Sequence, residues 1–249
     1  MLIDDIVVMD SLEFLKSLED NSVDLIVTSP PYNKGWWSKN RNINNGAYTK
    51  SRHIDYGVFD DRMTPKAYET WQRSILTECI RVIKPTGSIF YNHIDILHEH
   101  LTLFPRYVLD YPLKQIIVWN KRNTPRIDKS YFFPITEYIF WIKKSDGART
   151  KFNRKDCRYL KSIWEFGAAT DNNHPAPFPI DLAENCILAC TDKGDVVCDP
   201  FMGSGTTAIA AKVNNRHYIG CDLNEAFVSL AKIRIRQPMG LSILSLCLQ

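Results

Sequence analysis

The chain has 249 residues, of which 45% are hydrophobic and 24% charged, proportions typical of an ordinary soluble globular protein. Its formal net charge is only +3, and no apolar stretch approaches the ~18 residues of a membrane-spanning helix. Because the segment from Met1 to Asp5 does not resemble a signal peptide either, we expect a cytoplasmic protein that makes no membrane contact.

Short apolar runs rich in β-forming residues predict seven strands. They lie at 5–9, 23–27, 88–91, 115–119, 138–142, 195–198 and 218–221. Helical patterns separate most of these runs, and alternation of strands with helices predicts a doubly wound, mostly parallel sheet. No helical pattern lies between 115–119 and 138–142, so we expect an antiparallel pair there. The predicted fold class is α/β, with 1–249 forming one domain.

The helix boundaries follow from capping residues and prolines. Ser11 is expected to cap a helix that runs to about Leu18. Thr64 followed by Pro65 is a cap with proline at the first helical position, and apolar residues then repeat at helical spacing until Lys84-Pro85. Further helices are predicted over 180–190, 206–213 and 225–235.

The seven cysteines are scattered, and several lie in apolar runs, which predicts buried free thiols. No two of them have CxxC spacing, and His98-Glu99-His100 does not match the HExxH motif of zinc enzymes. We therefore expect no metal site.

Two polar segments fit no predicted element, and both are basic. The first, 33–63, is too long for a plain connection, and loops of this size tend to be functional lids or disordered. Aromatic residues lie among the cations of both segments, and this combination suits phosphate contact together with base stacking, which makes nucleic acid the expected partner. We therefore expect 33–63 to be a flexible loop over the active site or the DNA, and the irregular 144–173 to be a small target-recognition insert. The candidate DNA-binding residues are Lys34, Lys39, Arg41, Arg52, Arg122, Arg126, Arg149, Arg154 and Arg158.

A glycine-rich turn follows the strand predicted at 195–198. It begins at Asp199 and contains Gly203 and Gly205 before the next helix. Glycines let backbone amides approach a ligand closely, and a helix N-terminus favours anionic groups. No lysine follows the glycines, so the turn is not a phosphate-binding P-loop. Asp222 ends the next predicted strand, where a carboxylate can accept both hydroxyls of a ribose; the alternative is that it caps the following helix.

The string Ser29-Pro30-Pro31-Tyr32 follows the strand predicted at 23–27. Proline fixes φ and lacks an N–H, so this turn is stiff and directs its carbonyl groups outward. The Ser29 hydroxyl and the Pro30 carbonyl can accept hydrogen bonds from a planar aromatic amine, which leaves the nitrogen lone pair available to attack an electrophilic methyl group. Tyr32 offers a ring on which a base can stack. The candidate catalytic residues are Ser29, Pro30, Pro31 and Tyr32.

With the proline turn first and the glycine turn second, the chain resembles the amino-group DNA methyltransferases of restriction–modification systems, in their permuted (β) class. That family's catalytic motif is Asp, Asn or Ser followed by Pro-Pro and an aromatic residue, and its FxGxG loop binds S-adenosyl-L-methionine. Asp10-Ser11-Leu12-Glu13 is similar to a family element that helps to hold the cofactor, and His174-Pro175-Ala176-Pro177-Phe178-Pro179 is similar to the family's HPAxFP motif. The resemblance implies a seven-stranded sheet, S-adenosyl-L-methionine as cofactor, and a target base flipped out of duplex DNA. The cofactor-binding residues that it implies are Asp10, His174, Pro175, Asp199, Phe201, Gly203, Ser204, Gly205, Thr206 and Asp222.

Serine in the first motif position favours the N4 amine of cytosine as the methyl acceptor, with the N6 amine of adenine as the alternative. Methylation of RNA or of a protein glutamine is a second alternative, but the related enzymes usually place the cofactor loop before the Pro-Pro-Tyr turn. A DNA-binding module that has lost its cofactor is a third, which S-adenosylmethionine binding would distinguish. Double-stranded DNA and a cognate restriction endonuclease are the expected partners. The tail after Gln237 is apolar, and two interpretations stay open: it packs on a second subunit of a homodimer, or it is an unselected extension.

Overall fold

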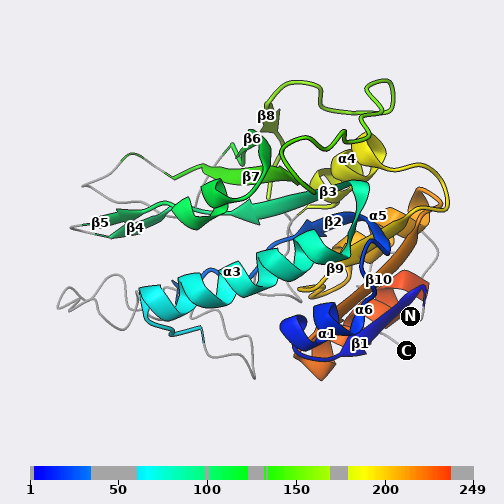
Figure 1. Cartoon of the computed structure of the whole chain (residues 1–249), viewed down its shortest axis with the longest axis horizontal. Helices are drawn as coiled ribbons and strands as arrows, with labels where there is room; N and C mark the ends of the chain where they lie inside the picture. Colours follow the sequence, from blue (N-terminus) through cyan, green and yellow to red (C-terminus); the bar gives the residue numbers. More distant parts are fainter. Residues whose placement is uncertain are drawn as a thin grey trace, which may run out of the picture.

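The computed structural model describes residues 3–34, 61–98, 101–122, 132, 134–168 and 179–236, with the backbone alone at 96–98 and 101–103. An eight-stranded sheet in the order β1-β10-β9-β2-β3-β7-β6-β8 forms its centre (Figure 1). Its strands are β1 (Asp5–Val8), β2 (Val23–Thr28), β3 (Ile83–His93), β6 (Leu113–Asn120), β7 (Thr136–Lys143), β8 (Ile163–Glu165), β9 (Val196–Asp199) and β10 (His217–Asp222). A separate pair joins β4 (Ile96–His98) to β5 (Leu101–Leu103).

The sheet is parallel from β1 to β3, and β7 is antiparallel to its neighbours β3 and β6. The doubly wound sheet and the antiparallel pair are therefore confirmed. The predicted number of strands was one too low for this sheet, because β8 adds parallel to β6 at the edge. Its three residues lie inside the basic insert, where so short a run gives no periodic signal.

Five α-helices and one 3-10 helix occur in the described residues. They are α1 (Ser11–Ser17), α3 (Pro65–Val82), η1 (Arg106–Asp110), α4 (Ile180–Cys190), α5 (Thr206–Val213) and α6 (Glu225–Arg236). Thr64 caps α3 as predicted, but the predicted cap of α1 was wrong. Asp10 caps that helix, because its Oδ1 accepts hydrogen bonds from the backbone N–H groups of Leu12 at 2.9 Å and Glu13 at 3.2 Å. Within this described part, no helix is long and apolar enough to cross a membrane.

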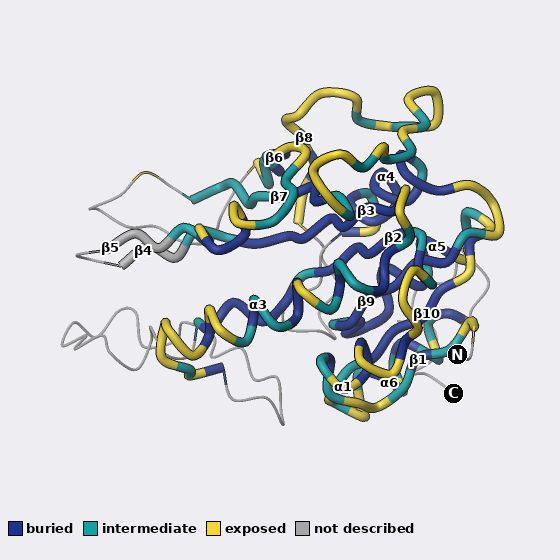
Figure 2. Tube along the Cα trace, in the orientation of Figure 1, coloured by how far each residue is buried: buried dark blue, intermediate teal, exposed yellow. Residues whose placement is uncertain are grey.

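The two faces of the sheet are covered by different helices. Leu15 of α1 and Ile75 of α3 belong to one core with Ile26 of β2. Ala183 of α4 belongs to the other core with Leu25 of β2, together with side chains of α5 and α6. Successive strand residues point to opposite faces, so a parallel strand covered on both sides is apolar at almost every position. Accordingly, β9 is buried at all four positions and β2 at every position except Asp24 (Figure 2).

The direction of winding reverses between β2 and β9. From β2 the chain passes through α3 to β3 on one side, whereas from β9 it passes through α5 to β10 on the other. The two strands pair directly, with Leu25 opposite Val197 and Ile26 opposite Cys198. In open α/β sheets, ligands bind in the crevice that such a reversal leaves at the carboxyl ends of the strands.

Candidate active site

The proline turn and the glycine turn meet at this reversal point. Thr28, the last residue of β2, donates its hydroxyl hydrogen bond to Asp199 Oδ1 at 2.7 Å, and Thr207 donates to Asp199 Oδ2 at 2.7 Å. The backbone N–H of Phe201 donates to Oδ1 at 3.0 Å. The Asp199 side chain is fully buried, and burial raises its pKa to about 6. Oδ1 therefore joins the glycine turn to the end of β2, Oδ2 braces the glycine turn internally, and a contact between Asp199 and a cofactor stays a prediction.

Within the catalytic turn, the side chains of Ser29 and Tyr32 are joined. Ser29 Oγ lies 2.6 Å from the Tyr32 hydroxyl. The Tyr32 ring packs on His93, with ring centroids 5.0 Å apart, and Lys34 Nζ lies 5.1 Å from its centroid. Only 5% of Tyr32 is exposed, so a base can stack on this ring only after a covering group has moved.

A buried hydrogen-bond network holds the turn from behind. The Tyr68 hydroxyl donates to the Pro31 carbonyl oxygen at 2.8 Å and lies 2.9 Å from His93 Nε2. Gln72 donates to the Tyr68 oxygen at 2.9 Å and accepts from the Tyr91 hydroxyl. Burial lowers the pKa of His93 to about 4, so this ring is neutral at physiological pH. Only an apolar helix face was predicted here from the sequence, and the polar Gln72 on the buried face of α3 was the signal that this prediction missed.

A second group of polar residues reaches the same turn from β3 and β7. Asn92 Nδ2 donates to the Tyr32 hydroxyl oxygen at 2.8 Å and to Glu137 Oε2 at 2.7 Å. Lys121 forms an ion pair with Glu137 Oε1 at 3.0 Å, and these two side chains are only 18% and 13% exposed. Sequence reasoning missed all three residues, although a glutamate at the start of an apolar strand was a usable signal.

The glycine turn is held against the end of β10. The backbone N–H of Gly203 donates to Asp222 Oδ2 at 2.9 Å, and that of Asn224 donates to Oδ1 at 2.9 Å. Burial raises the pKa of the Asp222 carboxyl group. The alternative that Asp222 caps the following helix was wrong, because Asn224 directly precedes α6 and its Oδ1 accepts from the Ala226 N–H at 2.9 Å.

Two glycines permit close contacts around this turn. A Cβ on Gly220 would lie 2.5 Å from the Asp199 carbonyl oxygen and 2.3 Å from Met202 Cε. Gly205 has a φ of +87°, and its Cβ would lie 2.8 Å from Ala231 Cβ on α6. Only glycine fits both places, because a side chain would collide with backbone in one and would be strained in the other.

The other predicted cofactor residues differ in their surroundings. Asp10 accepts both of its capping hydrogen bonds on Oδ1, and the adjacent Met9 N–H bonds the Asp222 carbonyl oxygen at 3.2 Å, so these strand ends are neighbours. Phe201 is half-buried and meets Trp71 edge to face at 5.7 Å. Ser204 is buried and accepts from Arg234 of α6 through both its side chain at 2.6 Å and its carbonyl at 2.7 Å.

Thr206 is buried at the start of α5, while His174 and Pro175 lie outside the described residues. Two carboxylates on neighbouring strand ends, a half-exposed aromatic ring and a glycine turn make a donor and acceptor set that fits a nucleoside. The residues of this end of the sheet therefore suit the predicted cofactor.

The structure describes only some of the predicted DNA-binding residues. Lys39, Arg41, Arg52 and Arg126 lie outside the described residues. Arg149, Arg154 and Arg158 are all exposed on the basic insert, and Arg158 also forms ion pairs with Glu184 at 2.6 Å and Asp181 at 3.5 Å. Arg122 is exposed and donates to the Glu165 carbonyl at 2.8 Å.

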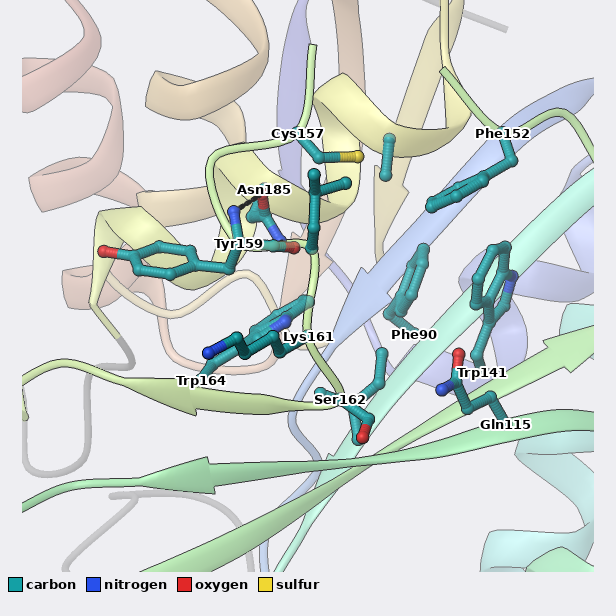
Figure 3. Close-up of a pocket in the computed structure, with 13 residues that line it drawn as sticks. Phe90, Gln115, Trp141, Phe152, Cys157, Tyr159, Lys161, Ser162, Trp164 and Asn185 are labelled. Carbon is teal, nitrogen blue, oxygen red and sulfur yellow. Dashed lines mark hydrogen bonds between the residues drawn. The ribbon is translucent and has the colours of Figure 1, made fainter. Parts of the chain in front are cut away.

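A pocket lies under the basic insert, away from both turns. Figure 3 shows Phe90, Trp141 and Phe152 on one side of it and Tyr159 and Trp164 on the other. None of the predicted catalytic or cofactor residues lines this pocket. It marks the place where the insert packs on the sheet and on α4, rather than the reaction site.

Comparison with known proteins agrees with this geometry. A family model described as DNA methylase, of the N6/N4 type, matches residues 23–233. The chain belongs to the DNA methylase family. The matched residues of this DNA methylase include both turns and every strand of the main sheet except β1.

Relatives and solved structures support the same family. The type II methyltransferase M.HpaI of Haemophilus parainfluenzae is 31% identical over 244 residues, which cover 91% of this chain and 72% of the enzyme. The type II methyltransferase M.BglII of Bacillus subtilis is 30% identical over 258 residues, which cover 89% of this chain and 66% of that enzyme. This DNA methylase therefore spans just under two thirds of the length of M.BglII.

Among solved structures, the PvuII DNA methyltransferase (cytosine-N4-specific) has a TM-score of 0.73 at 18% identity, covering 95% of this chain and 87% of that one, which shows a common fold. The TTHA0409 protein of Thermus thermophilus, complexed with S-adenosyl-L-methionine, has a TM-score of 0.65 at 26% identity, covering 92% of each chain. The methyltransferase family uses S-adenosyl-L-methionine, so the cofactor predicted from the sequence is confirmed.

Proposed function

We propose that this DNA methyltransferase transfers a methyl group to the N4 amine of cytosine at a specific sequence in duplex DNA, as the modification enzyme of a cytoplasmic restriction–modification system with a cognate endonuclease. The observation that carries the proposal is the junction of the Ser29-Pro30-Pro31-Tyr32 turn with the Asp199–Thr207 loop through Thr28. This junction supports the proposal, because it joins the turn with the candidate amine acceptors to the loop with the candidate cofactor contacts. The names of the type II relatives support the restriction–modification context.

The choice of cytosine rests on Ser29, a neutral hydroxyl where many adenine enzymes have a carboxylate. The PvuII neighbour, described as cytosine-N4-specific, shares the fold and agrees with this choice. Adenine presents a similar exocyclic amine, so the N6 position is the competing product.

In the proposed mechanism, catalysis is mainly positioning. The target base leaves the duplex, because its amine cannot reach the cofactor from within the base stack. Ser29 Oγ and the Pro30 carbonyl orient the amine, and Tyr32 packs against the base once its covering groups have moved. S-adenosyl-L-methionine supplies the electrophilic methyl group. Asp10 and Asp222 would hold the cofactor's nucleoside, with Phe201 beside it, and His174 and Pro175, which lie outside the described residues, are the further contacts that the sequence predicts.

The exposed cations of the basic insert are proposed to contact the phosphate backbone. Arg149, Arg154 and Arg158 are exposed, but the ion pairs of Arg158 hold its guanidinium against α4. Arg154→Ala should therefore reduce the slope of log affinity against log salt by about 0.9, and Arg158→Ala should change it less. Fluorescence anisotropy with labelled duplex DNA measures both slopes, and equal slopes for the two variants would remove Arg154 from the interface.

The deciding experiment identifies the methylated base. The purified protein is incubated with methyl-labelled S-adenosyl-L-methionine and mixed-sequence duplex DNA, and the digested nucleosides are identified by mass. N4-methylcytosine is the expected product. N6-methyladenine would overturn the choice of base but keep the mechanism, and labelling of RNA or protein without DNA would overturn the proposed substrate. Tyr32→Ala is expected to abolish turnover, and full activity in that variant would move the base site elsewhere.

A further inference from the structure

The catalytic turn contains a hydroxyl where a carboxylate would be the stronger acceptor, yet a carboxylate lies close behind it. Glu137 Oε2 lies 3.4 Å from the Tyr32 hydroxyl, which in turn lies 2.6 Å from Ser29 Oγ. Glu137 comes from β7 and is 105 residues from Tyr32 in the sequence. Its other oxygen is paired with Lys121 at 3.0 Å.

The Asn92 amide donates to both the Glu137 carboxylate and the Tyr32 oxygen. If this amide were flipped, its Oδ1 would stand 2.7 Å from Glu137 Oε2, and the two oxygens would repel. Its NH₂ group therefore donates one hydrogen to Glu137 and the other to the Tyr32 oxygen at 2.8 Å.

Asn92 is 1% exposed, and its Oδ1 has no hydrogen-bond partner among the described residues. Leaving the Asn92 carbonyl oxygen buried and unpaired costs free energy. The two hydrogen bonds that its NH₂ group donates, to Glu137 and Tyr32, offset that cost.

The hydrogen of the Tyr32 hydroxyl is then drawn to the carboxylate. The Tyr32 hydroxyl donates to Glu137 Oε2 over 3.4 Å, and a carboxylate in an ion pair can only accept, so the single hydroxyl hydrogen of Tyr32 points to Glu137. Ser29 consequently donates to the Tyr32 oxygen. The lone pairs of Ser29 Oγ remain to accept a hydrogen bond from an amine.

We propose that Glu137, held by Lys121 and Asn92, is a positioning residue that acts through Tyr32 to make Ser29 a hydrogen-bond acceptor for the target amine. Because the amine must present its lone pair to the methyl group, an acceptor on one of its hydrogens orients it for transfer. Glu137 thus supplies the directing charge that the serine in the motif lacks. The inference rests on the proposed function and holds for whichever exocyclic amine the enzyme methylates.

The test is Glu137→Gln, assayed on the DNA that the wild-type protein methylates. A glutamine leaves a donor facing either Asn92 or Lys121, and it removes the charge that orders the Tyr32 and Ser29 hydroxyls. We expect kcat to fall about 50-fold, while the dissociation constants for S-adenosyl-L-methionine and DNA stay within about twofold of wild type. Glu78→Gln is the matched control, since Glu78 is also a poorly exposed carboxylate in an ion pair, with Arg81 on α3, and its kcat should remain within about twofold.

Tyr32→Phe supplies a second variant that removes only the connecting hydroxyl. It should lower kcat about as much as Glu137→Gln, and adding Glu137→Gln to it should change kcat by less than about twofold, because the two residues act as one unit. Wild-type kcat in Tyr32→Phe, or equal losses from Glu137→Gln in both backgrounds, would overturn the proposal. If the wild-type protein itself methylates no nucleic-acid amine while binding S-adenosyl-L-methionine, the proposed function fails first.

Discussion

The predicted catalytic turn and cofactor loop lie on adjacent strand ends, but the turn is positioned mainly by side chains from other elements, whereas backbone N–H groups and close glycine contacts also hold the loop. Tyr68, Asn92 and Glu137 reach the turn or its tyrosine from three different elements. In the loop, the backbone N–H of Gly203 donates to the Asp222 carboxylate. Gly205 and Gly220 are packed so closely that a methyl group would not fit at either position. Substitutions at the turn should therefore change turnover, whereas those at the loop should change stability and cofactor affinity.

The largest expected effect is the loss of stability in Gly220→Ala, which tests the close glycine contacts around the cofactor loop. In Gly220→Ala the new Cβ meets the Asp199 carbonyl oxygen at 2.5 Å, and backbone cannot move aside as a flexible side chain can. We expect the free energy of unfolding to fall by about 3 kcal/mol, as measured in urea. Gly147→Ala is the control, since nothing lies within 4 Å of its Cβ. Similar stability of the two variants would show that the loop is not tightly packed.

Asp199→Asn tests a carboxyl side chain that joins the two regions. Burial raises the Asp199 pKa from 3.8 to about 6, so the folded state binds more protons than the unfolded state between these values. Its contribution to stability is full below pH 3.8 and is lost as pH rises through 6. Between about pH 4.5 and 7.5, the loss of this contribution should lower the free energy of unfolding of the wild-type protein by about 2 kcal/mol. The Asp199→Asn substitution should remove this part of the pH dependence of stability.

Urea unfolding at the two pH values measures the difference between the proteins. Parallel stability profiles for wild type and variant would mean that Asp199 titrates at an ordinary pKa.

Tyr68→Phe probes the hydrogen bonds behind the turn. The variant keeps the ring but leaves the Pro31 carbonyl without its donor and Gln72 without its acceptor. We expect the free energy of unfolding to fall by about 1.5 kcal/mol and kcat to fall with little change in cofactor affinity. Thr70→Val, on the exposed face of the same helix, should leave kcat unchanged. A change in cofactor affinity alone would contradict the division between the two regions.

Arg234→Met should have the smallest effect, a weaker affinity for the cofactor without a change in kcat. Arg234 donates to both Ser204 oxygens, so its loss frees the middle of the loop. We expect cofactor affinity to weaken by about fivefold, or ~1 kcal/mol, with kcat at saturating cofactor retained. Isothermal titration calorimetry gives the affinity, and Arg236→Met, an exposed change in the same helix turn, is the control. Reduced kcat with unchanged affinity would assign the loop a role in the chemical step.

The sequence alone determined the elements with a strong period and the two turns that are proposed to carry the chemistry. Continuous apolar strands, caps at helix starts and the glycine and proline positions are local signals, so α4 and α5 were predicted with their observed bounds. The same local reasoning missed β8 and chose Ser11 instead of Asp10 as a cap, because neighbouring residues compete for these roles with nearly equal propensity.

Only the tertiary structure decided which side chains serve those turns. Thr28 meets Asp199 across 171 positions of sequence, and Glu137 approaches Tyr32 across 105. Such contacts depend on the order of the strands in the sheet, because the reversal of winding brings β2 against β9 and the antiparallel return places the start of β7 beside the end of β3. A hydrogen bond between distant residues leaves no period or spacing in the sequence. The turns could therefore be found from the sequence, whereas the groups that orient them could not.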